Sequence, residues 1–362
     1  MSKTISTQTG RGIIAAAVLA SAVESRAAES QDEFLARVQN PSNDVKFAAW
    51  KVADQQDPSV IGPLSKLLLS EDPAVAKAAE ECLNKIVHSV GKDKNDPKRK
   101  AVSQQLQKML DEGPDSLKVY ALRAFSLVGD DEVVPVITPW LEKQEMREEA
   151  VYALERMPGS VSAKALLDAL APAPRDFKPR VIAALGHRKI EEAVMPLAAI
   201  MGESDTDLDL AIDAMKALAR IGKKVPEGTD VPEFDSLTPR QKAAFLDSTL
   251  RYADAQVKNG NGGEAAFLYN YFFTMDEPEQ AEEHYHCAAI VGMSKIDSPD
   301  VVEKIASRLT YEPSYIVRKT AANCLKEMKG DQVNTSLKTL FDNASGAMKD
   351  ELKAVIDARG KA

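Results

Sequence analysis

Apolar and small residues recur along this chain with one spacing that repeats eight times. In each copy an apolar residue precedes an anchor position, a small residue follows three positions after the anchor, and an apolar or small pair follows three positions later. Residues three and four apart share one face of an α-helix, so each copy predicts a helix with a narrow face of small side chains. The anchors recur about every 31 residues, with one longer and one double step: Lys46, Ala76, Lys118, Arg147, Lys178, Ala211, His286 and Arg318.

A second apolar segment follows five of these copies, after a break rich in Asp, Gly or Pro. Three of the second segments have a proline near their start, at Pro63, Pro135 and Pro196. Proline is tolerated in the first turn of a helix, where its missing N–H has no partner to lose. We therefore predict helix–turn–helix units that bury their apolar faces only by stacking. The predicted second helices span 60–69, 133–141, 163–170, 193–200 and 301–309.

This pattern resembles the HEAT repeat family, in particular its short bacterial type, which is similar to the repeats of phycocyanobilin lyases. The segment from Lys118 to Ile137 carries the likeness most clearly, with its basic anchor, its small-residue helix, its Gly-Asp turn and its proline-containing second helix. The likeness covers roughly residues 33–345, with a gap near 223–280. It implies an all-α fold, an α-α superhelix or solenoid of about nine or ten stacked helix pairs. It implies little about activity, since such repeats mostly bind other molecules.

The repeat pattern divides the chain into four parts. Residues 1–30 form an N-terminal segment, 31–222 a first HEAT repeat block, 223–236 a linker, and 237–362 a second HEAT-like block with an aromatic-rich repeat. The linker is predicted from its prolines, its acidic residues and its lack of an apolar period. After it, Thr238 is expected to cap a new helix.

The N-terminal segment fits two interpretations. Lys3 and Arg11 precede a short apolar run, and the small residues around Ser21 fit a signal-peptidase cleavage rule. Alternatively, Arg11 begins a degenerate capping repeat whose second helix spans 34–38. The second interpretation favours a cytoplasmic protein, and a signal peptide over residues 1–22 would make the protein periplasmic or secreted.

The net charge of the chain narrows the classes of possible partner. The formal net charge is −9 and the pI is near 5.2, whereas nucleic-acid-binding proteins normally show a basic surface. The same charge is repelled by anionic membrane surfaces, and no run of 18 apolar residues is present. We therefore expect neither nucleic acid nor a membrane as a partner.

The three cysteines, Cys82, Cys287 and Cys324, lie in different repeats, and we expect them to be unpaired, small and buried.

Aromatic residues concentrate between positions 245 and 285. One interpretation is a repeat that packs rings in its core, with Phe267, Phe272 and Phe273 buried. The alternative is a surface that docks a partner, because aromatic anchors dominate interface energetics. The candidate partner-binding residues are Tyr269, Tyr271 and Tyr285.

Few stretches of the chain approach a catalytic or metal-binding motif. His284 and His286 lie two residues apart, so they point to nearly opposite sides of a helix, and we expect a polar surface helix there. The run of aspartates that ends at Asp209 lacks the glycine and the final glutamate of a calcium loop and fits an acidic helix N-terminus. No His-Glu pair occurs, which separates the chain from the helical-repeat di-iron hydroxylases. We predict no catalytic, cofactor-binding or metal-ligating residue.

These observations favour a non-catalytic scaffold or adaptor that binds a protein or peptide partner. The alternative is a bilin lyase-like enzyme, which rests only on the resemblance of the repeats. A helical-repeat DNA glycosylase is a third possibility, which the acidity of the chain disfavours.

Overall fold

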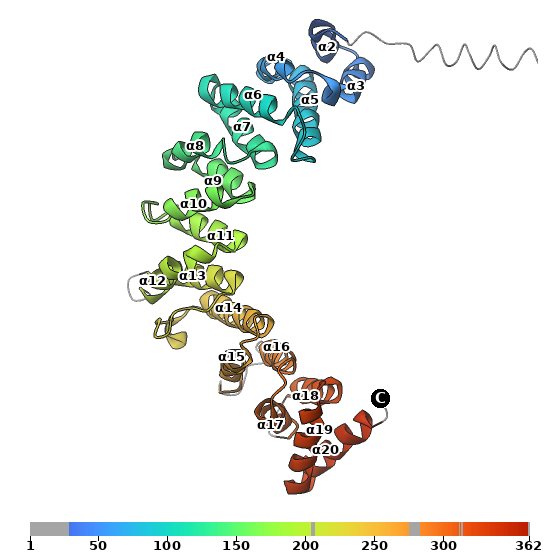
Figure 1. Cartoon of the computed structure of the whole chain (residues 1–362), viewed down its shortest axis with the longest axis vertical. Coiled ribbons are helices and arrows are strands. Elements are labelled where there is room, and N and C mark those ends of the chain that lie inside the picture. Colours follow the sequence, from blue (N-terminus) through green and yellow to red (C-terminus); the bar gives the residue numbers. More distant parts are fainter. Residues whose placement is uncertain (1–28, 204–206, 275–282, 311, 313, 361–362) are drawn as a thin grey trace, which may run out of the picture. The chain divides into compact units, whose positions relative to one another are not determined.

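The computed structural model describes residues 29–203, 207–274, 283–310, 312 and 314–360 (Figure 1). These residues form 19 α-helices, linked by turns and short 3-10 segments, and they contain no strand. The predicted all-α class is therefore confirmed. The chain divides into two compact units, of which the first ends at Met157 and the second begins at Pro158.

The first unit is a row of helices with a second layer against it. The helices α3, α5, α7 and α9 pack on one another in sequence, and α4, α6 and α8 lie against this row. Each helix of the row buries its small-residue face against the next. The helices of this unit are α2 (Gln31–Val38), α3 (Asn43–Lys51), α4 (Ile61–Leu67), α5 (Pro73–Gly91), α6 (Arg99–Glu112), α7 (Asp115–Val128), α8 (Val134–Ile137) and α9 (Arg147–Arg156).

The second unit repeats this arrangement. The helices α11, α13, α14, α16, α18 and α20 form the row, and α10, α12, α15, α17 and α19 pack against it. The helices are α10 (Ser160–Asp168), α11 (Lys178–Arg188), α12 (Val194–Gly202), α13 (Leu208–Ile221), α14 (Pro239–Lys258), α15 (Gly262–Thr274), α16 (Glu283–Met293), α17 (Pro299–Ser307), α18 (Tyr315–Glu327), α19 (Asp331–Asn343) and α20 (Gly346–Arg359).

The predicted small-residue face is buried in every copy. The residue three positions after each anchor has no solvent exposure, and seven of these eight residues are alanine. A side chain this small lets the helix axes approach closely, while the larger Leu, Met and Phe neighbours fill the grooves. The eight residues are Ala49, Ala79, Ala121, Ala150, Val181, Ala214, Ala289 and Ala321.

The predicted second helices are also present. Pro63, Pro135 and Pro196 each lie within the first three residues of α4, α8 and α12. The double step in the repeat is filled by α14 and α15, a pair whose spacing the sequence pattern did not reveal. As expected, Thr238 caps α14: its hydroxyl accepts a hydrogen bond from the Gln241 amide, and the Gln241 side chain accepts one from the Thr238 amide.

The segment 223–236 lies inside the second unit, between α13 and α14. Apart from a 3-10 turn at Phe234–Ser236 it has no helix. The border between the compact units therefore does not coincide with this segment. At the other end of the chain, α2 provides the expected helix over 34–38, with Phe34 and Val38 fully buried. The predicted cleavage site and the rest of the capping repeat lie outside the described residues. None of the described helices combines the length and the apolarity that crossing a bilayer requires.

Candidate functional site

The aromatic-rich region lies on α14, α15 and α16. Tyr269 and Phe272 are fully buried, and Tyr285 is 8% exposed, whereas Phe267 is 78% exposed. The expectation that Tyr269 and Tyr285 present themselves to a partner is therefore wrong, because buried rings cannot anchor one. The expectation that Phe267 belongs to the core is also wrong, whereas that for Phe272 is confirmed. Phe273 is only partly buried, with its ring beneath the Arg308 guanidinium at 4.7 Å.

The buried tyrosines satisfy their hydroxyl groups inside the fold. Tyr269 donates a hydrogen bond of 2.6 Å to Asp254 on α14, and burial raises the pKa of Tyr269. Tyr285 donates a hydrogen bond of 3.5 Å to the Ala243 carbonyl. These partners allow α15 and α16 to bury rings that sequence reasoning placed at the surface.

Tyr271 is the one member of the predicted trio that keeps partial exposure. Its ring packs against Phe245 and Phe234, with centroid distances of 5.9 and 6.2 Å. It also lines a cavity, so its assignment as a partner-binding residue stays a prediction.

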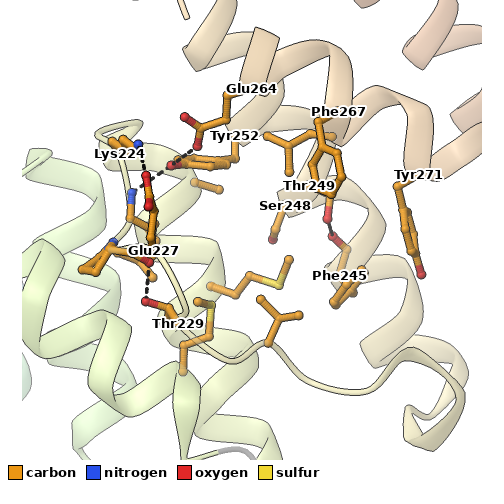
Figure 2. A pocket seen from close by; sticks show the side chains of 18 of the residues that line it. Lys224, Glu227, Thr229, Phe245, Ser248, Thr249, Tyr252, Glu264, Phe267 and Tyr271 are labelled. Atoms are coloured by element: carbon orange, nitrogen blue, oxygen red, sulfur yellow. Dashed lines mark hydrogen bonds and ion pairs between the residues drawn. The ribbon is translucent and has the colours of Figure 1, made fainter.

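This cavity, of about 800 Å³, lies between α13, the segment 224–231, α14 and α15 (Figure 2). The apolar stripe of α13 forms one wall with Met215, Leu218 and Ala219. On the opposite side α15 contributes Phe267, Leu268 and Tyr271. The segment 224–231, which lacks apolar periodicity, closes a third side. Sequence reasoning missed the cavity because a non-helical segment forms this side.

The cavity wall formed by α14 consists of Phe245 and three side chains with hydroxyl groups, Ser248, Thr249 and Tyr252. Ser248 and Thr249 are both buried, and Thr249 donates a hydrogen bond of 3.0 Å to the Phe245 carbonyl. In Figure 2 the hydroxyl of Ser248 points into the space between α13 and α15. The Thr249 hydroxyl is thus committed to its own helix, and the space it borders is suited to an apolar group.

Three charged residues and Tyr252 gather at one end of the cavity (Figure 2). Lys224 pairs with Glu227 at 2.9 Å. Tyr252 accepts a hydrogen bond from the Val225 amide at 2.9 Å and donates one to Glu264 at 3.2 Å. Burial raises the pKa of Tyr252 to about 12, so this phenol is protonated at neutral pH. The tyrosine therefore holds the segment 224–231 against α15 as a neutral donor and acceptor.

The polar groups of the cavity lining include two carboxylates and several hydroxyl groups. No histidine or cysteine is among its described lining residues. Its carboxylates, Glu227 and Glu264, are bound to Lys224 and Tyr252. The threonine hydroxyls of the lining donate to backbone carbonyls, so none of them is paired with a base in the manner of an activated nucleophile. The lining is therefore predominantly apolar.

The prediction that His286 lies on a polar surface helix is wrong, because His286 is buried. Its Nδ1 lies 4.0 Å from Oε2 of Glu312, which is also buried, and Arg308 reaches the same carboxylate at 3.8 Å. Burial lowers the pKa of His286. His284, two residues earlier, is exposed as expected. Within the described part of the chain, no group of three or more potential ligands could hold a metal ion.

Asp207 and Asp209, the described members of the acidic run, lie at the N-terminus of α13, as predicted. Asp207 caps α13 by accepting a hydrogen bond of 3.1 Å from the Leu210 amide, and Arg175 pairs with the same carboxylate. The Arg175 guanidinium holds the pKa of Asp207 below its ordinary value.

All three cysteines are free, and burial raises the pKa of Cys82 to about 12. Cys287 and Cys324 lie on the neighbouring helices α16 and α18, and burial together with the nearby Cys287 thiol raises the pKa of Cys324, so the expected isolation of the cysteines holds only for Cys82.

Comparison with known proteins adds no functional assignment. No protein-family model and no curated protein matches the sequence. The solved structures that are similar include an engineered protein (18% identity, TM-score 0.36, covering 91% of this chain and 98% of that one). Human deoxyhypusine hydroxylase in complex with glycerol is also similar (12% identity, TM-score 0.24, covering 86% and 100%). At such values neither likeness carries a functional argument. The stacked helix pairs and their buried small-residue faces show that the chain is a HEAT-like helical repeat protein.

Proposed function

We propose that this protein is a non-catalytic scaffold that binds a protein or peptide partner, and that an apolar side chain of the partner enters the cavity between α13, α14 and α15. The observation that carries the proposal is an apolar cavity of about 800 Å³ beside an aromatic ring, Phe267, that is 78% exposed. Ligand pockets commonly measure roughly 300–1,000 Å³, so the space accommodates large side chains.

A peptide fits this arrangement better than a small ligand does. Phe267 and Val231 line the cavity but remain largely exposed, at 78% and 54%. A small molecule held inside the cavity would leave most of both side chains in water. A peptide that crosses the mouth covers them while one of its side chains fills the interior. Exposed aromatic residues beside a pocket are typical anchors of such interfaces.

Peptides selected from a random phage-displayed library on the intact chain provide the test. We expect the selected peptides to share an apolar residue and to lose affinity for two variants. Phe267→Ala removes the exposed ring, and Ser248→Leu fills the cavity from α14. Each should weaken binding by at least about 1 kcal/mol. Because Phe267 is exposed, Phe267→Ala should leave the free energy of unfolding nearly unchanged.

Phe47→Ala provides a matched control. Phe47 is also an exposed phenylalanine, at 53%, but it lies on α3 in the first unit. The variant should bind the selected peptides like the parent protein. Equal binding by all three variants, or no enriched peptide, would contradict the proposed site. An absorbance shift on mixing the protein with a bilin and its acceptor apoprotein would contradict the non-catalytic assignment.

A further inference from the structure

A second cavity, of about 640 Å³, lies on a different face of α14 from the apolar one. Its walls are the C-terminal ends of α11 and α13 and the face of α14 that carries positions 247, 251, 254 and 258. It shares only Ala219 with the apolar cavity. Six charged side chains line it: Lys189, Arg220, Asp247, Arg251, Asp254 and Lys258.

Positive charge predominates in this cavity. Asp254 already accepts the Tyr269 hydroxyl and lies 3.7 Å from the Lys295 ammonium group. Asp247 precedes Arg251 by one helical turn. Lys189 and Arg220, by contrast, form no side-chain hydrogen bond or ion pair with another described residue. Two cations thus face the cavity without a counter-charge, in a chain whose formal net charge is −9.

The helix dipoles explain why part of this positive charge is found here. Arg220 and Lys258 lie in the last turns of α13 and α14, where cations are favourable. Lys189 differs, because its backbone is left-handed, with φ 55° and ψ 47°. It is the only non-glycine residue with positive φ in the part of the chain that the structure describes. One repeat later, Gly222 ends α13 with φ 72°.

The comparison of Lys189 with Gly222 indicates that the lysine at position 189 is not explained by the backbone conformation, which glycine adopts more easily. A left-handed residue at a helix end is normally glycine, because a Cβ atom is sterically strained in this conformation. The backbone at Lys189 needs no side chain, since its amide donates to the Gly186 carbonyl and the next amide to Leu185. The strain at this position therefore accompanies a basic residue of the cavity lining.

We propose that this basic cavity binds an acidic segment of a protein partner, with Lys189 and Arg220 each pairing with a carboxylate. The proposal concerns a second site and does not depend on the use of the apolar cavity. The C-terminal ends of α11 and α13 carry the negative ends of their helix dipoles, which disfavour a small anion held close to the backbone. Carboxylates on flexible side chains can stay farther from the helix ends and reach the long Lys and Arg side chains. The guanidinium of Arg220 suits bidentate pairing with a carboxylate.

Fluorescence anisotropy of a labelled hexaglutamate peptide, titrated with the intact chain, tests this site. We expect binding that weakens about tenfold in Lys189→Gly and in Arg220→Gln, as the loss of one charged hydrogen bond implies. Lys189→Gly is informative because glycine prefers the left-handed backbone. This variant should melt at the same temperature as the parent or higher, so lost binding cannot reflect unfolding.

Two control variants test whether the binding of hexaglutamate is specific to the basic cavity. Lys319→Gln removes an exposed lysine of α18 that lies outside the cavity lining, and it should leave the affinity for hexaglutamate unchanged. Phe267→Ala should also leave it unchanged, which separates this site from the apolar cavity. Equal affinity in all four variants, or no binding of hexaglutamate, would overturn the proposal. Displacement of the peptide by an equal concentration of inorganic phosphate would show a small-anion site and would also overturn it.

Discussion

The ring of Tyr269 on α15 lies directly against the backbone of Gly292 on α16. A Cβ atom added at Gly292 would lie 2.3 Å from Cζ and 2.4 Å from the hydroxyl oxygen of Tyr269. The same hydroxyl donates its hydrogen bond to Asp254 on α14. One tyrosine therefore joins three helices, and its place in the core depends on the absence of a side chain at position 292.

Gly292→Ala should destabilise the protein by about 1–3 kcal/mol, because the added methyl group overpacks a buried ring. The midpoint of urea unfolding measures this loss. Gly263→Ala is the matched control, since a Cβ at this helical position meets nothing within 4 Å. The control should be neutral or gain up to about 1 kcal/mol from helix propensity. Equal effects of both substitutions would contradict the contact.

Tyr269→Ala should cost about 3–5 kcal/mol of unfolding free energy, as expected for a fully buried aromatic residue. Phe267→Ala, two residues earlier on the same helix, should cost almost nothing because its ring is exposed. Thermal melts of the two variants check the rotation of α15. A large loss for Phe267→Ala with a small one for Tyr269→Ala would mean that α15 faces the other way.

Ala121→Leu, Ala150→Leu and Ala184→Leu should each destabilise by about 1–3 kcal/mol, since all three alanines are fully buried between helices. Chemical denaturation of the single variants measures the effect. Ala354→Leu on α20 is the control, because Ala354 is exposed in the middle of a helix. Unchanged stability of the three buried variants would show that these faces are not packed as described.

Stability should fall as the pH decreases below about 6.5, the ordinary pKa of histidine. Burial lowers the pKa of His286 in the folded protein, although Glu312 and Glu283 oppose this shift and Arg308 adds to it. The unfolded chain therefore binds a proton at pH values where the folded chain does not, and proton uptake favours unfolding. Above the ordinary pKa this contribution is constant.

Urea midpoints at about pH 7.5 and 5.5 measure this dependence. His286→Gln should reduce the difference between the two midpoints relative to the parent protein. His284→Gln, which changes the exposed histidine two residues earlier, should leave the difference as it is. A parent protein that becomes more stable at the lower pH would contradict the assignment.

The repeat architecture could be predicted because its signal is local and recurrent. Ala121 and Ala150 mark the same slot of successive helices, and a small residue at this slot is needed wherever two helices approach closely. The prolines at Pro63 and Pro196 mark helix starts for an equally local reason. Such signals depend on one helix at a time, so the sequence alone reveals them.

The candidate site could not be predicted in the same way. The aromatic residues of α15 occupy nearly all faces of the helix, so the spacing of apolar residues could not decide that Tyr269 points inward and Phe267 outward. The deciding features are Asp254 and Gly292, which belong to other helices. Likewise, one side of the apolar cavity is the segment 224–231, whose conformation depends on the hydrogen bonds of Tyr252.

The helix α14 forms a wall of both cavities, with Ser248 and Tyr252 facing the apolar one and Arg251 and Lys258 facing the basic one. A rigid helix transmits any displacement from one of its faces to the other. Filling either cavity in a way that moves α14 therefore changes the affinity of its neighbour, and thermodynamic linkage requires the same factor in both directions. A partner that carries both an apolar side chain and an acidic stretch would then bind the two cavities with affinities that are coupled through α14.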